Sequence, residues 1–332
     1  MSAAGCLISV YFKFTSIGRN RLHELRSVHF IGNIRSIIIL EDKIKMDEEY
    51  SNDDDVWNAS AVILDIDSGS WADRSPLHDA ASHGRLLALR TLILQGHSVN
   101  VLTIDHVTPL HEACVGDHVA CARALIDAGA NVNASTIDGV TPLFNACTVG
   151  SVACTEILLE NGAKPQRLVY DPSPIHEATS KGHYGCVEAL VTWGADVDMD
   201  IPHLGTALYT ACVCQELECA RKLLREGANV QKGRSLDSPL HAAAEQDSTA
   251  VVKLLLDFGA DINARNTEFQ RPVDVAPPSS LTEGFLLLYE ATPRLLSQMC
   301  RQCIRSCVGR DRLHLLSHLP LPNRLRNYLQ YQ

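Results

Sequence analysis

The chain has 332 residues, of which 46% are hydrophobic and 20% are charged, and its formal net charge is −10. Such a balance is ordinary for a folded protein, and the length exceeds that of a single core, so we expect two domains or an elongated repeat array. The acidic balance gives no reason to expect nucleic-acid binding, which normally needs a basic face, and without a run of about eighteen apolar residues no membrane helix is predicted.

Residues 1–70 show no repeat. Up to residue 40 the charged side chains are mainly basic, and two acidic runs follow at 47–49 and 53–55. N-terminal segments that contain Arg and Ser but few acidic residues resemble organellar transit peptides. The acidic runs favour a disordered leader instead, and this is the interpretation we adopt. Met46 is an alternative start of translation.

A period of 32 or 33 residues organises the chain from about residue 72. It is marked by a Pro (once an Ala) and by a Gly twenty residues later. The marker positions are Pro76, Pro109, Pro142, Pro174, Ala207, Pro239 and Pro272, and the glycines are Gly96, Gly129, Gly162, Gly194, Gly227 and Gly259. The spacing varies only between a Gly and the next Pro, as expected for a loop that joins rigid units.

Each unit has the same internal sequence pattern. It opens with Ser or Thr before the Pro, as in Thr108-Pro109-Leu110-His111, and this pattern begins a helix because the hydroxyl caps free N–H groups. Paired aliphatic residues such as Leu125 and Ile126 precede the Gly, which is the expected left-handed helix terminator. Every unit is therefore predicted to be a helix, a tight turn, a second helix and an extended connector.

These openings and closings resemble the ankyrin repeat. The resemblance implies an all-α fold: a solenoid of stacked helix pairs over residues 71–290, with β-turn fingers at the connectors and a concave face. Six clear repeats are expected near 72–104, 105–137, 138–169, 170–202, 203–234 and 235–267, and a degenerate seventh at 268–290.

Cysteine and histidine follow the same period. Cys114, Cys147 and Cys212 share one position, and Cys121, Cys154, Cys186 and Cys219 share another. Thiols in register on helices are packing residues, so we predict reduced cysteines in a cytosolic protein. The shared histidines (His78, His111, His176 and His241) look, in ankyrin repeats, like hydrogen-bonding groups that stabilise the turn.

No residues suggest catalysis. His111-Glu112 and His176-Glu177 begin like a zinc-protease helix, but Val115 and Ser180 stand where the second ligand should be. Phosphate-binding glycine motifs are absent from the sequence, and the carboxylates form no recognisable acid–base pair. We therefore expect a non-enzymatic protein that needs no cofactor and no metal.

The repeat pattern stops near Ala291, and a basic tail follows at 291–332. Leu296, Cys300 and Ile304 lie four residues apart, and Met299, Cys303 and Cys307 widen the stripe, which predicts an amphipathic helix. Such a helix either packs on the last repeat or lies in a partner's groove. The second part is predicted to be a Pro-stiffened turn followed by a helix.

Together the two parts resemble a SOCS box. Leu296, Cys300 and Ile304 match its elongin-binding element. Its cullin-5-selecting element is matched by Leu316, Leu319, Pro320, Leu321, Pro322, Leu325, Tyr328 and Leu329. The combination resembles the ankyrin repeat and SOCS box family, which implies a substrate receptor that recruits elongin B/C, cullin-5 and its RING subunit. The resemblance further implies ubiquitination and degradation of a bound protein, in the cytoplasm or in the nucleus.

Two rival interpretations remain for the tail. It could be a folded cap for the end of the solenoid, which would make the protein a plain ankyrin scaffold. Alternatively, Cys300, Cys303 and Cys307 could bind zinc with His314, although the three thiols span two helical turns.

Further family-level expectations concern the connectors. The finger positions Asp105, His106, Asp138, Gly139 and His203 are our expected substrate contacts. Asn133 and Asn263 resemble sites of the asparaginyl hydroxylase that acts on ankyrin repeats.

Overall fold

The computed structural model describes residues 74–166 and 172–331, so the predicted leader at 1–70 lies outside the described residues. Within them the chain is helical, with isolated β-bridges at Ile201–Gly205 and Arg234–Asp237 and no strand. This confirms the all-α prediction. None of the helices in the described ranges is long and apolar enough to cross a membrane.

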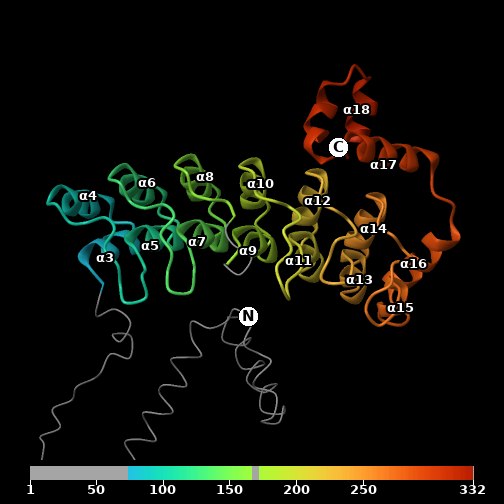
Figure 1. Cartoon of the computed structure of the whole chain (residues 1–332), viewed down its shortest axis with the longest axis horizontal. Coiled ribbons are helices and arrows are strands. Elements are labelled where there is room, and N and C mark those ends of the chain that lie inside the picture. Colours follow the sequence, from blue (N-terminus) through green and yellow to red (C-terminus); the bar gives the residue numbers. More distant parts are fainter. Residues whose placement is uncertain (1–73, 167–171, 332) are drawn as a thin grey trace, which may run out of the picture. The chain divides into compact units, whose positions relative to one another are not determined.

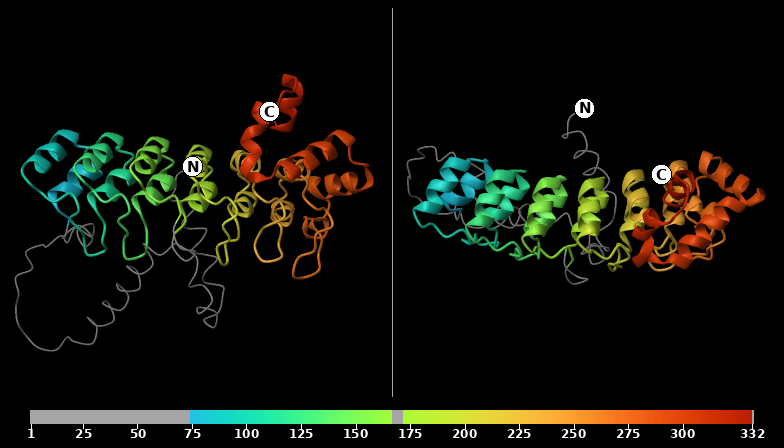
Figure 2. Two further views of the ribbon diagram at one scale, coloured as in Figure 1. Left: turned by 45° about the horizontal axis from the view of Figure 1, so that its top comes forward. Right: turned by 90° about the horizontal axis from the view of Figure 1, so that it is seen from above.

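Helix pairs follow one another along the chain and form two rows (Figure 1). Each helix contacts its counterpart in the next repeat, and the view from above shows the second row side by side (Figure 2). The first row is α3 (Pro76–Ser82), α5 (Pro109–Val115), α7 (Pro142–Val149), α9 (Pro174–Ser180), α11 (Ala207–Val213), α13 (Pro239–Glu245) and α15 (Pro272–Val275). The second row is α4 (Leu86–Leu94), α6 (Val119–Asp127), α8 (Val152–Glu160), α10 (Tyr184–Thr192), α12 (Leu217–Arg225), α14 (Thr249–Asp257) and α16 (Leu281–Ala291).

The seventh pair departs from the others because α15 has only four residues. The tail then forms α17 (Leu296–Val308), a 3₁₀ segment at Arg310–His318 and α18 (Asn323–Leu329). Both predicted helices of the tail are therefore present.

A continuous apolar core runs between the two rows. Leu110, Leu143, Leu208 and Leu240, at equivalent positions of the first-row helices, are all 0–1% exposed. A unit of this size cannot bury its own apolar face, so stacking on a neighbour supplies the missing contacts. The core is thus made between repeats as much as within them.

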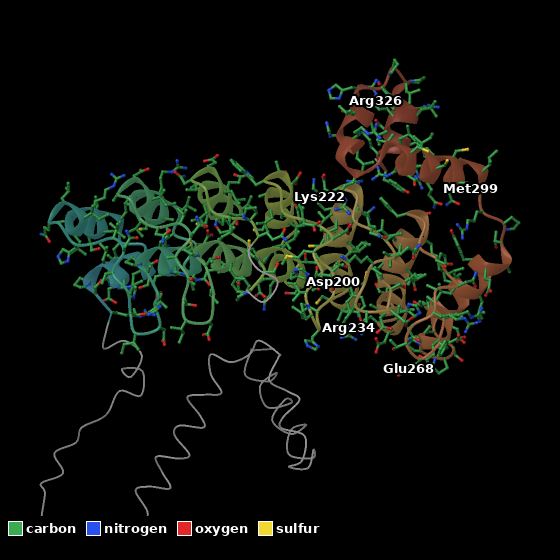
Figure 3. The ribbon with its side chains drawn as sticks, in the orientation of Figure 1. Asp200, Lys222, Arg234, Glu268, Met299 and Arg326 are labelled. Carbon is green, nitrogen blue, oxygen red and sulfur yellow. The ribbon has the colours of Figure 1, made fainter. Side chains whose placement is uncertain are left out.

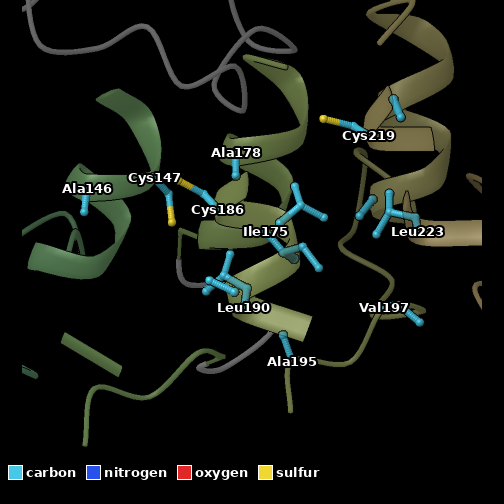
Figure 4. Packing of buried hydrophobic residues seen from close by; sticks show 14 of the residues in the cluster. Ala146, Cys147, Ile175, Ala178, Cys186, Leu190, Ala195, Val197, Cys219 and Leu223 are labelled. Carbon is cyan, nitrogen blue, oxygen red and sulfur yellow. The ribbon is translucent and has the colours of Figure 1, made fainter. Parts of the chain in front are cut away.

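All seven in-register cysteines lie in this core with free thiols, as predicted. Figure 4 shows Cys147, Cys186 and Cys219 among their apolar neighbours. Burial raises the pKa of the Cys219 thiol to about 12. A hydrogen bond with Cys114 lowers the pKa of Cys154 to about 7, but the Cys154 side chain is fully covered. No group of histidine, cysteine and carboxylate side chains suited to a metal occurs among the described residues.

In the four repeats that have it, the shared histidine joins the repeat to the next one. Nδ1 of His111 accepts the Thr108 N–H (3.1 Å), and its Nε2 lies 3.2 Å from the carbonyl of Val140 in the following finger. His78, His176 and His241 make the corresponding 3.0–3.1 Å contacts to Val107, Gly205 and Gln270. Because one nitrogen accepts and the other donates, the ring must be neutral. Burial accordingly lowers the pKa of both His111 and His176 to about 4.

These pKa values predict a pH-dependent stability. Between about pH 6.5 and pH 4 the unfolded chain binds protons at His111 and His176 that the folded chain excludes, so stability is lost as the pH falls through this window. The loss should reach about 2–3 kcal/mol per histidine by pH 4.5. Urea unfolding at pH 7.0, 5.5 and 4.5 measures it. In a His111→Gln, His176→Gln variant the decrease should be smaller, and an unchanged decrease would contradict the assignment.

Candidate protein-binding sites

Helix α17 has two faces of opposite character. The predicted elongin-binding residues lie on the outer one, where Leu296 is 76% exposed, Ile304 is 40% exposed and Cys300 is also exposed. Met299, on the same helix, lies at the surface of the tail (Figure 3). Six apolar or thiol side chains of one helix therefore face solvent: Leu296, Met299, Cys300, Cys303, Ile304 and Cys307.

The polar face of α17 turns toward the repeats. The Arg305 guanidinium donates to the carbonyls of Leu224 (3.3 Å) and Arg225 (3.0 Å) at the end of α12. Gln302 donates to the Asp257 carbonyl at the end of α14 (3.1 Å), and Gln298 to its carboxylate (3.0 Å). The last carbonyls of a helix have no partner within it, and a cation there also suits the helix dipole. The amphipathic helix is thus docked by its polar side.

The apolar face continues into a hollow within the tail. A cavity of about 410 Å³ lies between α17 and the 3₁₀ segment. It is lined by Cys303, Ile304, Cys307, Val308, Arg312, Leu315, Leu316 and Leu319. An exposed apolar ridge beside a mainly apolar hollow is a typical protein-binding surface.

The second predicted element is only partly at the surface. Pro320, Pro322 and Leu325 are exposed, and Leu319, Leu321 and Tyr328 are half-buried. Leu316 and Leu329, by contrast, are only 1% and 5% exposed. In this structure the side chains of these two leucines are almost fully covered, although Leu316 also lines the hollow beside α17.

An arginine that the motif does not include holds this element in shape. Arg326 donates to the carbonyls of Ser317 (3.1 Å) and Leu321 (3.2 Å), which lie on both sides of Leu319-Pro320. Proline cannot donate a backbone hydrogen bond, and the side chain of Arg326 supplies donors to the segment instead. In the sequence, the only indication of this role for Arg326 was a tail that contains many arginines and few acidic residues.

The predicted substrate positions lie at the finger tips. Asp105, His106, Asp138 and His203 are exposed and Gly139 is half-buried. His106, Gly139 and His203 have φ of 60°, 79° and 70°, the left-handed conformation that closes each turn. Asp200, Arg234 and Glu268 lie on the same finger side of the repeats (Figure 3).

The finger tips also carry apolar side chains that sequence reasoning missed. Ile104 is 81% exposed and Phe269 is 77% exposed, and Ile137, Leu204 and Leu236 are exposed at neighbouring tips. The repeat period placed these residues on the fingers, but it did not indicate that their apolar side chains would be exposed and not buried in the core. They add apolar contact area to a surface that otherwise has mixed charge.

Asn133 and Asn263, the two asparagines that resemble hydroxylation sites, differ in their environment. The Asn133 side chain bridges two repeats, since its Nδ2 donates to the Gly162 carbonyl (2.9 Å) and its Oδ1 accepts from the Lys164 N–H (2.9 Å). Asn100 makes the same pair of bonds to Gly129 and Asn131. Asn263 is exposed, and its only hydrogen bond in the described ranges runs from its backbone N–H to Asp261 (3.0 Å).

Two protein-family models match the chain. The ankyrin-repeat family model (three copies) matches residues 77–169, 135–201 and 175–266, and the SOCS box model matches residues 292–330. Both models thus match in the order that the sequence motifs predict.

Full-length relatives show the same combination. Rabbit (Oryctolagus cuniculus) ankyrin repeat and SOCS box protein 5 is 70% identical over 264 residues, covering 80% of this chain and 80% of the relative. Human (Homo sapiens) ankyrin repeat and SOCS box protein 11 is 59% identical over 265 residues, covering 80% of this chain and 82% of the relative.

A solved structure supports the repeat fold. The crystal structure of the human ASB11 ankyrin repeat domain matches with a TM-score of 0.64 and 53% identity, over 67% of this chain and all of that one. With the repeats, the SOCS box and these relatives in agreement, the chain belongs to the ankyrin repeat and SOCS box protein family.

Proposed function

We propose that this protein is the substrate-recognition subunit of an elongin B/C–cullin-5 ubiquitin ligase, acting in the cytoplasm or nucleus. The observation that carries the proposal is the orientation of α17, whose polar face contacts the repeats while Leu296, Cys300 and Ile304 face solvent. An exposed apolar helix face next to an apolar hollow fits a protein partner. The SOCS box and the family support a ligase receptor role in general; elongin B/C and cullin-5 are the specific part of the proposal.

In this proposal the chain contributes proximity and no bond chemistry. The repeats hold a target protein through finger residues such as Asp105, His106, Asp138 and His203, and the tail brings a ligase whose E2 carries ubiquitin. Tethering raises the effective concentration of target lysines near the E2, which is a rate advantage without a catalytic residue.

The scaffold alternative, in which the tail only caps the solenoid, is less consistent with the contacts. A cap would cover the end of the last repeat, yet Leu281 and Leu288 of α16 are 83% and 66% exposed. The tail instead contacts the ends of α12 and α14 and leaves its own apolar face uncovered.

Truncating apolar side chains on the outer face of α17 should weaken binding of elongin B/C. Truncating buried anchors of an interface costs on the order of 2–4 kcal/mol, so Leu296→Ala with Cys300→Ala should weaken binding about thirtyfold to several-hundredfold. Affinity for purified elongin B/C is the measurement. A matched control is Leu87→Ala with Leu94→Ala, which truncates two exposed leucines of α4 and should leave affinity unchanged. Equal affinity for all three proteins would favour the cap.

The Pro-stiffened turn should act at a later step of assembly. Replacing Leu319, Pro320, Leu321 and Pro322 by alanine removes a half-exposed surface but leaves the outer face of α17 intact. Capture of elongin B/C should therefore persist, while recruitment of cullin-5 by the preassembled complex falls at least tenfold. The two steps are measured separately by pull-down, and undiminished cullin-5 recruitment would remove this segment from the proposal.

Hydroxylation, where it occurs, should favour Asn263 over Asn133. The Asn133 amide must leave two inter-repeat hydrogen bonds to enter an enzyme, whereas no such bond holds the Asn263 side chain within the described part of the chain. Peptide mass spectrometry of protein from oxygenated cells compares the two sites. Higher occupancy at Asn133 would contradict this order.

A further inference from the structure

One aromatic pair joins the tail to the repeats. Tyr331, which follows α18, stacks on Phe258, which follows α14, with ring centroids 3.5 Å apart and planes 12° from parallel. The Tyr331 hydroxyl donates to the Asp257 carbonyl (2.8 Å). One side chain of the tail therefore makes both a stacking contact and a hydrogen bond with the end of α14.

Two arginines also contact Tyr331, one at its ring and one at its backbone carbonyl. The Arg301 guanidinium lies 3.7 Å from the Tyr331 ring centroid and 4.4 Å from that of Tyr328, and the side chain is only 8% exposed. Arg225, the last residue of α12, donates to the Tyr331 carbonyl (2.6 Å). Cation–π contacts are strongest when water is excluded, as it is here. Tyr331 is thus held between Phe258 of the repeats and Arg301 of α17.

A second attachment lies at the other end of α17. Arg310 forms ion pairs with Asp196 (3.3 Å) and with Asp198 in the connector after α10. The side chains of Arg310 and Asp196 are 41% and 51% exposed, and exposed ion pairs contribute little, so this second attachment restrains the tail less than the covered contacts around Tyr331. Between the two attachments a cavity of about 360 Å³ remains, lined in part by Leu224, Phe258, Arg305 and Leu313. The junction is therefore held by discrete side-chain contacts and not by a continuous packed core.

We propose that Tyr331 is a positioning residue, which fixes the orientation of the ligase-recruiting tail relative to the substrate-binding repeats. This inference rests on the proposed function, since it concerns the direction in which a bound target faces the ligase. Loss of the ring should leave the outer face of α17 unchanged but allow the tail to take several orientations.

Small-angle X-ray scattering of the full chain bound to elongin B/C tests this inference. Tyr331→Ala should shift the pair-distance distribution to longer distances, with elongin B/C affinity unchanged within about twofold. Tyr331→Phe keeps both the stacking and the cation–π contact and loses only one hydrogen bond, so its scattering should stay close to that of the unmodified chain. Asn327→Ala, an exposed change on α18, is the matched control.

Phe258→Leu tests the same contact from the repeat side and should reproduce the shift, even where the tyrosine variant folds poorly. Superimposable distributions for Tyr331→Ala, Phe258→Leu and the unmodified complex would overturn the inference. Failure of the unmodified chain to capture elongin B/C would instead refute the proposed function. The scattering comparison on the free chains would then still decide whether Tyr331 fixes the tail.

Discussion

The arrangement of the tail depends on carbonyl groups that helices cannot satisfy themselves. The last carbonyls of α12 and α14 accept hydrogen bonds from Arg305, Gln302 and Tyr331. An unmade hydrogen bond at a covered carbonyl costs on the order of 1–3 kcal/mol, so these contacts favour one docking face of α17 over the others. Once the polar face is directed inward, helical periodicity alone turns the apolar face outward. The exposure of the apolar face is therefore a consequence of how the helix is held.

Much of the fold was predictable because the same helix-start and helix-end residues recur from repeat to repeat. A Thr-Pro opening at Thr108-Pro109 is weak by itself, but seven marker positions in register fix the units and assign His111 and Cys114 to structure. The structure agrees, since this histidine position bridges adjacent repeats at His78, His111, His176 and His241, and the seven in-register thiols are buried. The amphipathic helix of the tail likewise followed from the spacing of Leu296, Cys300 and Ile304, whereas the spacing left open which way its apolar face turns.

Sequence reasoning failed where a contact depends on distant parts of the chain. The motif includes Leu316 and Leu329, and no sequence feature indicated that their side chains would be only 1% and 5% exposed in the folded chain. No sequence pattern pointed to the contacts that Arg305 and Tyr331 make with the repeats. Arg305 binds the end of a helix 80 residues earlier and Tyr331 binds one 74 residues earlier, and no local pattern encodes such a separation.

The fingers have a consequence for how such a receptor can diversify. The turn bonds of each finger are local, as between Thr103 and Val107, while exposed tips such as Ile104 and Asp105 contribute little to the core. Tip residues can therefore be exchanged, one repeat at a time, at small cost in folding stability. The ligase-facing tail is attached to α12 and α14 and is insulated from such exchanges at the first repeats. If the fingers hold the target, as proposed, a single scaffold of this kind can be retargeted to new proteins while its output stays the same.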